Sequence, residues 1–281
     1  MSRISQTFRS LRTAQSGAYI PYVCAGDPDI DFTIELVRRL CRSGADILEI
    51  GLPFSDPLAD GPTVQEAMGR SLSSGFRVSD VFELVRAFRN DGIHQPIVLM
   101  TYYNPVLSFG VGEFCTRLAD SGGDAMLVVD LPIEESEELD TAARKNDLDV
   151  IRLVTPTTDD GRLDVLLSMA SGFAYAVSVA GITGARAMLA ESAIALVKRV
   201  RSRSELPVVI GFGISSPDHV RKTMAAGASG VVEGSALISR YAPHLSDRSK
   251  ALELVEQHAR EMKAATCRSG PEDLPCANRT L

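Results

Sequence analysis

Short apolar runs recur along the chain at spacings that predict eight β-strands. The runs cover residues 18–24, 47–50, 97–101, 125–129, 150–154, 174–178, 208–212 and 230–232. They are bounded by glycine, proline or polar residues, and their continuous apolar character is typical of parallel strands buried on both faces. We therefore expect a sheet that other elements cover on each side.

The segments between these runs carry apolar residues at helical spacing. They cover residues 32–43, 78–90, 112–121, 136–146, 164–170, 187–201, 217–226 and 250–266. A further helix is expected to begin near Thr63, and a short one after the last strand. Regular alternation of strand and helix predicts a single-domain (β/α)8 TIM barrel over residues 1–267. The alternative is an open doubly wound sheet, but the first strand–helix turn, residues 24–28, lacks a GxGxxG dinucleotide fingerprint.

Composition and charge argue for a large folded core and against nucleic-acid and membrane partners. The chain has 281 residues, of which 45% are hydrophobic, enough for a large core. A net charge of −7 without a basic block argues against nucleic acid, which needs clustered Lys and Arg. There is no apolar run of membrane-spanning length and no apolar signal region near the N-terminus, so we expect a cytoplasmic protein with no membrane contact. Residues 268–281 mix proline, glycine and charges, and we expect a disordered tail.

Cysteine and histidine give no sign of a metal site. The cysteines are odd in number, widely spread and without a CxxC pair, which argues against a disulfide framework and against zinc. The four histidines have polar neighbours, and we expect each to lie at the surface: His94, His219, His244 and His258.

Two acidic residues around the second strand are candidates for acid–base chemistry. Glu49 lies near the end of an apolar run and should be buried, where desolvation raises the pKa of a carboxyl group. Three prolines then define a long, stiffened loop that carries Asp60. A lone Asp in such a loop more often caps a turn or a helix. In a barrel, however, both carboxylates would project to the rim that holds active sites.

Glycine-rich turns follow each of the last three predicted strands. They include Gly184, Gly213 and Gly234, and the last turn adds the hydroxyl of Ser235. Glycine lets backbone N–H groups approach an anion closely, and the late loops of barrels often hold phosphate. One such turn alone is more often a tight strand–helix connection. Three in neighbouring late loops predict a phosphate site.

The segment PFSDPLADGPTVQ at residues 53–65, directly after Glu49, resembles the hallmark of the tryptophan synthase α subunit family. The resemblance extends to residues 20–22, 26–28, 100–105, 130–132, 211–215 and 234–235. It implies a lyase that cleaves indole-3-glycerol phosphate to indole and glyceraldehyde 3-phosphate. It also implies that Glu49 transfers protons, that Asp60 holds the indole N–H group, and that this chain itself carries no cofactor.

The resemblance further implies an apolar pocket for the indole ring. Its expected residues are Tyr22, Val64, Met100, Leu127, Val129, Leu153, Tyr175, Thr183 and Phe212. Ordinary barrel core explains each of them equally well, because inward strand residues fill barrels whatever their function. Val179 stands where some bacterial members carry a basic residue, which bears on how the loop after the sixth strand closes.

The family resemblance also implies a partner, a pyridoxal-phosphate-dependent β subunit in an α2β2 tetramer that receives the indole. Contacts are expected from Asp56, Asn104 and Pro105. Three other readings stay open at this point: another phosphate-binding barrel enzyme, a free-standing lyase that releases indole, and a non-catalytic activator of a β subunit. The first need not keep Glu49 together with the proline-rich loop, and the last need not keep the carboxylates or the glycine turns.

Overall fold

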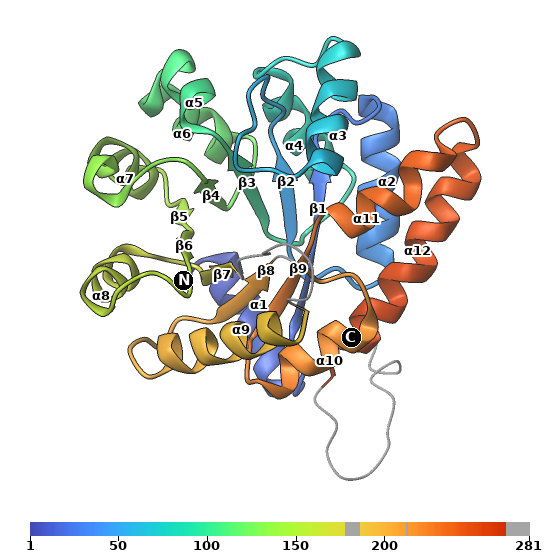
Figure 1. Cartoon of the computed structure of the whole chain (residues 1–281). Helices are drawn as coiled ribbons and strands as arrows, with labels where there is room; N and C mark the ends of the chain where they lie inside the picture. The colour runs from blue at the N-terminus through green and yellow to red at the C-terminus, as the bar shows by residue number, and fades with distance from the viewer. Residues whose placement is uncertain (178–185, 212, 268–281) are drawn as a thin grey trace.

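The computed structural model of the protein describes residues 1–177, 186–211 and 213–267. Nine parallel strands surround a central axis, and helices lie outside them (Figure 1). The strands are β1 (Ala18–Cys24), β2 (Leu48–Gly51), β3 (Ile97–Thr101), β4 (Ala125–Val128), β5 (Asp149–Val150), β6 (Arg152–Val154), β7 (Ala174–Val177), β8 (Val208–Gly211) and β9 (Gly230–Glu233). Their order in the sheet is β5-β4-β3-β2-β1-β9-β8-β7-β6.

The two ends of this sheet are consecutive pieces of one run, and that closes the barrel. β5 pairs with β4 and β6 pairs with β7, while only Ile151 lies between β5 and β6. The N–H group of Ile151 donates to the carbonyl of Met126 at 2.9 Å, so the connection to the β4 side continues through the interruption. The nine strand segments thus occupy eight strand positions, and the predicted (β/α)8 barrel is confirmed.

Helices follow the strands in alternation and cover the outside of the barrel (Figure 1). Those described are α1 (Arg3–Thr13), α2 (Ile30–Arg42), α3 (Pro62–Ser73), α4 (Asp80–Asn90), α5 (Tyr103–Phe109), α6 (Val111–Asp120), α7 (Glu137–Lys145), α8 (Asp160–Met169), α9 (Arg186–Arg201), α10 (Pro217–Ala225), α11 (Ser235–Tyr241) and α12 (Arg248–Ala264). The sequence prediction missed α1 and α5. α1 does place Ile4, Phe8 and Leu11 at helical spacing, and this pattern near the N-terminus was overlooked. α5 is seven residues long with a proline inside it, so it carries no clear helical repeat.

Strand register decides which side chains enter the barrel. Tyr22 pairs with Glu49, and Met100 pairs with Leu127, so these residues share the inner face. Because side chains alternate along a strand, Gly51, two positions after Glu49, also faces inward. A methyl group at Gly51 would lie 2.2 Å from the hydroxyl oxygen of Tyr22. Only glycine there leaves room for the Tyr22 ring inside the barrel.

β7 and β8 repeat this arrangement on the other side of the barrel. Leu153 pairs with Tyr175, and a methyl group at Gly211 would lie 2.1 Å from the Tyr175 hydroxyl oxygen. Two tyrosines from opposite halves of the barrel therefore fill its interior beside glycines of the neighbouring strands.

His258 is buried, so the surface position expected for all four histidines is wrong for this one. It lies on α12 with 3% of its surface exposed, and its Nε2 is 2.6 Å from Oε1 of Glu233 at the end of β9. The hydroxyl of Tyr19 donates to the other carboxyl oxygen at 2.8 Å. The polar sequence around His258 gives no sign of this, because the partner carboxyl group is supplied by the barrel wall.

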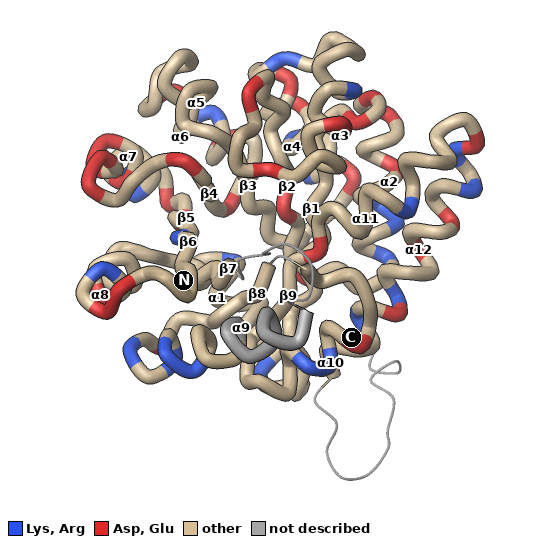
Figure 2. The backbone as a smooth tube through the Cα atoms, in the orientation of Figure 1, with Lys and Arg blue, Asp and Glu red and all other residues tan. Residues whose placement is uncertain are grey.

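No helix in the described part of the chain is both long and apolar enough to cross a membrane. The expected tail, residues 268–281, lies outside the described residues. Basic and acidic residues are interspersed along the outer helices in the view of Figure 2.

Candidate active site

Glu49 lies on β2 and points into the barrel with 2% of its surface exposed. Its Oε2 atom accepts no hydrogen bond from any described residue. Burial, and secondly the charge of Asp60, raise the pKa of Glu49 to about 8. The side chain is therefore mostly protonated at neutral pH and can give up a proton without breaking an ion pair.

Asp60 lies in the loop between β2 and α3 and is partly buried. The hydroxyl of Tyr102 donates to Oδ2 of Asp60 at 2.6 Å and accepts the backbone N–H of Ala59 at 3.0 Å. Burial raises the pKa of Asp60, while the Tyr102 hydrogen bond opposes this rise. The two carboxyl groups thus sit in different environments, the arrangement that lets one site hold an acid and a base together.

Tyr102 joins the candidate site through its bond to Asp60, although no sequence pattern singled it out. Its ring also packs on Phe54 of the proline-rich loop, with ring centroids 5.2 Å apart. Tyr102 follows β3 directly, so it lies at the same end of the barrel as the loop after β2. In the sequence, the indication of this role is the position of Tyr102 directly after the predicted strand 97–101, inside the segment 100–105 that resembles the family.

Tyr22 and Tyr175 lie beside the two carboxyl groups. Both are almost fully buried, and burial raises the pKa of each hydroxyl far above its usual value, with Glu49 and Asp60 among the further causes. The Tyr22 hydroxyl has no hydrogen-bond partner in the described part of the chain. It is a buried donor within the barrel mouth, which a bound molecule can satisfy.

The apolar residues expected around the site come from several elements. Leu127 is 1% exposed on β4, and Val64 is 7% exposed on α3, close to the loop that carries Asp60. Met100, Val129 and Leu153 are partly buried and pack against the core. Thr183 and Phe212 lie outside the described residues.

The late turns are described in part. Gly213 has a φ of +75°, a left-handed conformation that favours glycine, and a methyl group there would meet open space. Gly234 caps the N-terminus of α11 and lies against the Tyr22 ring, since a methyl group on it would be 3.8 Å from that side chain. Ser235 is exposed at the first position of α11. Gly184 lies outside the described residues.

The residues expected to contact a partner differ in exposure. Asp56 and Asn104 are exposed, but Pro105 is buried within α5. Its neighbour Leu107 is 53% exposed, and Leu58 in the loop after β2 is 92% exposed. Of the residues expected at a partner contact, Asp56 and Asn104 are therefore accessible and Pro105 is not.

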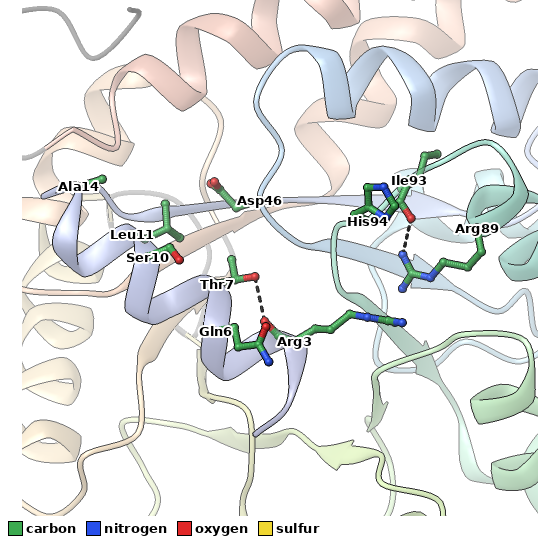
Figure 3. A pocket seen from close by; sticks show the side chains of 10 residues that line it. All are labelled: Arg3, Gln6, Thr7, Ser10, Leu11, Ala14, Asp46, Arg89, Ile93 and His94. Atoms are coloured by element: carbon green, nitrogen blue, oxygen red, sulfur yellow. Dashed lines mark hydrogen bonds between the residues drawn. The ribbon is translucent and has the colours of Figure 1, made fainter. Parts of the chain in front are cut away.

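A cavity of about 570 Å³ lies at the opposite end of the barrel, between α1 and the segments that lead into β2 and β3 (Figure 3). All the N–H groups of Arg89 in this cavity already donate to protein oxygens, including the carboxylate of Asp124. Asp46 is likewise paired, with Lys263 at 2.7 Å. These charges hold the closed end of the barrel together, and the candidate chemistry lies at the other end.

No group of three or more His, Cys, Asp and Glu side chains within the described ranges could hold a metal ion. A closed (β/α)8 barrel with ionisable side chains at the carboxyl ends of its strands defines the class of barrel enzymes. Comparison with known proteins narrows this class.

The family model of the tryptophan synthase alpha chain matches residues 8–267. The chain is 48% identical over 247 residues to the tryptophan synthase alpha chain of Gluconobacter oxydans, covering 88% of this chain and 91% of the relative. It is 44% identical over 254 residues to that of Methanothermobacter thermautotrophicus, covering 90% and 94%. The chain therefore belongs to the tryptophan synthase alpha chain family.

Solved structures agree with this assignment. The tryptophan synthase alpha chain of Legionella pneumophila superimposes with a TM-score of 0.88 at 32% identity, covering 97% of this chain and 100% of the other. A chain of Mycobacterium tuberculosis tryptophan synthase gives a TM-score of 0.86 at 35% identity, covering 95% and 99%.

Proposed function

We propose that this chain cleaves indole-3-glycerol phosphate to indole and glyceraldehyde 3-phosphate in a retro-aldol reaction, with Glu49 and Asp60 as the catalytic residues. The observation that carries the proposal is the environment of Glu49. It is a buried carboxyl group with one unpartnered oxygen and a pKa of about 8, set beside a second carboxyl group in a more polar environment. Family membership supplies the substrate class.

The chemistry requires a proton at the carbon of the ring that bears the side chain. Protonation at C3 converts the indole into an indolenine whose nitrogen is electron-poor. Loss of the proton from the side-chain hydroxyl then forms the aldehyde, the carbon–carbon bond breaks, and its electron pair restores the indole ring. A carboxyl group that is protonated at neutral pH suits these transfers, and we assign them to Glu49.

Asp60 is assigned to the ring nitrogen. A carboxylate there accepts a hydrogen bond from the indole N–H and stabilises the positive charge of the indolenine. Tyr102 supports this role, because its hydroxyl holds one oxygen of Asp60 and keeps the pKa of this carboxyl group lower than burial alone would set it. Tyr102 is thus a positioning residue for Asp60.

The phosphate and the ring are assigned to opposite parts of the barrel mouth. We propose that Gly184, Gly213, Gly234 and Ser235 hold the phosphate through backbone N–H groups and the serine hydroxyl. The indole ring would lie among Tyr22, Val64, Met100, Leu127, Val129, Leu153, Tyr175, Thr183 and Phe212. The close approach of Gly234 to Tyr22 supports a continuous site from phosphate to ring.

We further propose that the chain works with a tryptophan synthase β subunit in an α2β2 tetramer. The β subunit would take up the indole and carry the pyridoxal phosphate, and the α chain would need no cofactor of its own. Exposed Leu58 and Leu107 support a docking surface next to Asp56 and Asn104, because large exposed apolar side chains mark protein contacts. The barrel domain at residues 1–267, the tail after it and a cytoplasmic location remain predictions.

The test is the release of indole from indole-3-glycerol phosphate by the purified chain, alone and with added β subunit. Slow release that the β subunit accelerates is the expected result. Fast release by the chain alone would identify a free-standing lyase. No release in either case, with the Glu49→Gln variant equally inactive, would overturn the proposal and leave a non-catalytic activator.

A further inference from the structure

A third buried carboxylate lies near the site but takes no part in the proposed chemistry. Asp27 follows β1 and is fully buried. Arg70 donates two hydrogen bonds to it, from Nε to Oδ1 at 2.7 Å and from Nη2 to Oδ2 at 2.8 Å. The hydroxyl of Tyr241 donates to Oδ2 at 2.6 Å. Both oxygens are therefore engaged, and Asp27 has no exposed surface through which to act on a substrate.

The two partners of Asp27 belong to the elements that carry the two ends of the proposed site. Arg70 lies on α3, which begins just after Asp60. Tyr241 is the last residue of α11, which begins at Ser235 in the proposed phosphate turn. α11 packs against both α3 and β1, and the two helices lie side by side next to β1 in Figure 1.

A second contact ties α3 to the same turn. The hydroxyl of Ser71 donates to the carbonyl of Ala25 at 2.6 Å. Gly26, between Ala25 and Asp27, has a φ of +76°, and a methyl group on it would lie 2.4 Å from the ring of Phe76. This turn is therefore closely surrounded, and a shift of Asp27 must move its partners as well.

Burying a carboxylate is costly even when it is paired, so such a cluster is a poor way to gain stability alone. Its hydrogen bonds are directional, however, and they fix the relative positions of β1, α3 and α11, because a bidentate arginine and a short hydroxyl bond fit only one arrangement of these elements. An apolar contact between α3 and α11 would allow sliding.

We propose that Asp27, Arg70 and Tyr241 form a positioning cluster that sets the distance between the Asp60 loop and the phosphate turn. The inference rests on the proposed function, in which the substrate spans these two elements. Neither Arg70 nor Tyr241 touches the substrate in this proposal. Each acts through the helix that carries it, Tyr241 on the phosphate end and Arg70 on the Asp60 end.

Tyr241→Phe removes one hydroxyl and keeps the Asp27–Arg70 pair, so the fold is preserved. Loosening of α11 weakens phosphate binding in ground and transition states alike. We expect KM for indole-3-glycerol phosphate to rise roughly tenfold with kcat nearly unchanged. The dissociation constant for inorganic phosphate, measured by calorimetry, should rise by a similar factor. KM and kcat are measured on the complex with the β subunit, and phosphate binding is measured on the isolated chain.

Arg70→Gln should lower kcat as well, because α3 and the Asp60 loop then also lose their anchor. The matched control is Arg39→Gln, which breaks a 2.8 Å ion pair between α2 and α12 away from the site. Arg39 and Arg70 have almost equal side-chain exposure, 27% and 28%. The control should lose less thermal stability, because Glu256 is partly exposed and keeps Arg260 whereas Asp27 is fully buried. Its KM and kcat should be unchanged.

Hydrogen exchange separates this inference from the proposed function. If the protein releases no indole, the cluster is still tested by whether Arg70→Gln speeds amide exchange in both residues 56–65 and residues 234–241 beyond the Arg39→Gln control. The inference is overturned if both variants keep wild-type KM, phosphate affinity and exchange while losing only stability. In that case the cluster is structural.

Discussion

At the scale of single residues, the environment of Glu49 is the central feature of this protein. The side chain sits on a strand that is buried along its whole length, and its unpartnered oxygen faces the barrel interior. A carboxyl group in this position can serve acid–base chemistry, but its ionised form is poorly solvated and therefore destabilises the folded state.

The raised pKa of Glu49 links stability to pH. The folded value of about 8 lies above the ordinary value of 4.5, so between these values the folded state holds more protons than the unfolded state. Its contribution is fully present below about pH 4.5 and is lost as pH rises to 8. Glu49→Gln removes this dependence. We expect its free energy of unfolding at pH 8 to exceed that of the wild type by a few kcal/mol, on the order of the linkage value.

Urea unfolding of both proteins at pH 5, 7 and 8 measures this difference. The same variant should lose kcat for indole release by roughly 10²- to 10⁴-fold. Equal pH dependence in the two proteins would contradict the buried, ionisable state of Glu49, and retained turnover would remove it as the acid–base residue.

Tyr102 offers a second test at the residue scale. Tyr102→Phe removes the hydrogen bond that opposes the rise of the Asp60 pKa, so this pKa should rise further. Ionised Asp60 then appears only at higher pH, and the acidic limb of kcat/KM should move upward in pH, with a loss of roughly tenfold at neutral pH. The control is Tyr103→Phe, which keeps the Tyr102–Asp60 bond. An unmoved acidic limb would show that the hydroxyl does not tune Asp60.

At the scale of elements, α12 is held to the barrel by buried polar contacts as well as apolar packing. His258 reaches Glu233 at the end of β9, and Lys263 reaches Asp46 before β2. The helix thus connects two strand positions on either side of β1. Such contacts are strong only while both partners are present, because a single buried polar group is left unsatisfied when the other is removed.

His258→Phe tests the role of this helix. The ring is replaced by one of similar size, and the carboxyl group of Glu233 keeps only Tyr19. We expect the free energy of unfolding to fall by about 2 to 3 kcal/mol, measured by urea denaturation with an unchanged slope. His94→Phe, at an exposed histidine, should leave it nearly unchanged. A neutral His258→Phe would mean that Glu233 finds another partner.

At the scale of the whole molecule, the two ends of the barrel differ in structure and in proposed role. The end opposite the site is closed by α1 and by ion pairs of Arg89 and Asp46. The end that holds Glu49 and Asp60 presents long connections and exposed leucines. This division matches the general rule that barrels place function at the carboxyl ends of strands and stability at the other end.

Leu107→Asp tests the proposed docking surface. A charge at this exposed position on α5 should raise the concentration of β subunit needed for half-maximal stimulation of indole release by roughly tenfold or more. Val165→Asp is the matched control, since Val165 on α8 is 49% exposed against 53% for Leu107. Equal stimulation of both variants would move the docking surface elsewhere.

Local patterns along the chain are enough to predict the barrel architecture. Strands and helices follow from local spacing of apolar residues, and their alternation in number and length allows few topologies besides a closed barrel. Burial of Glu49 follows from the same local pattern, since the run around it is apolar on both sides. The hallmark segment at residues 53–65 indicates the family in the same way, since its residues are consecutive and can be recognised without the fold.

Which distant groups meet depends on the folded arrangement of the chain. The Tyr102–Asp60 bond joins residues 42 positions apart, and Tyr241 reaches Asp27 across 214 positions. The burial of His258 depends likewise on Glu233 in another element. No local pattern encodes such pairs, because they arise from strand register and helix packing after the barrel closes. The pKa of Glu49 belongs to this second group, since its value depends on surroundings that the folded chain assembles.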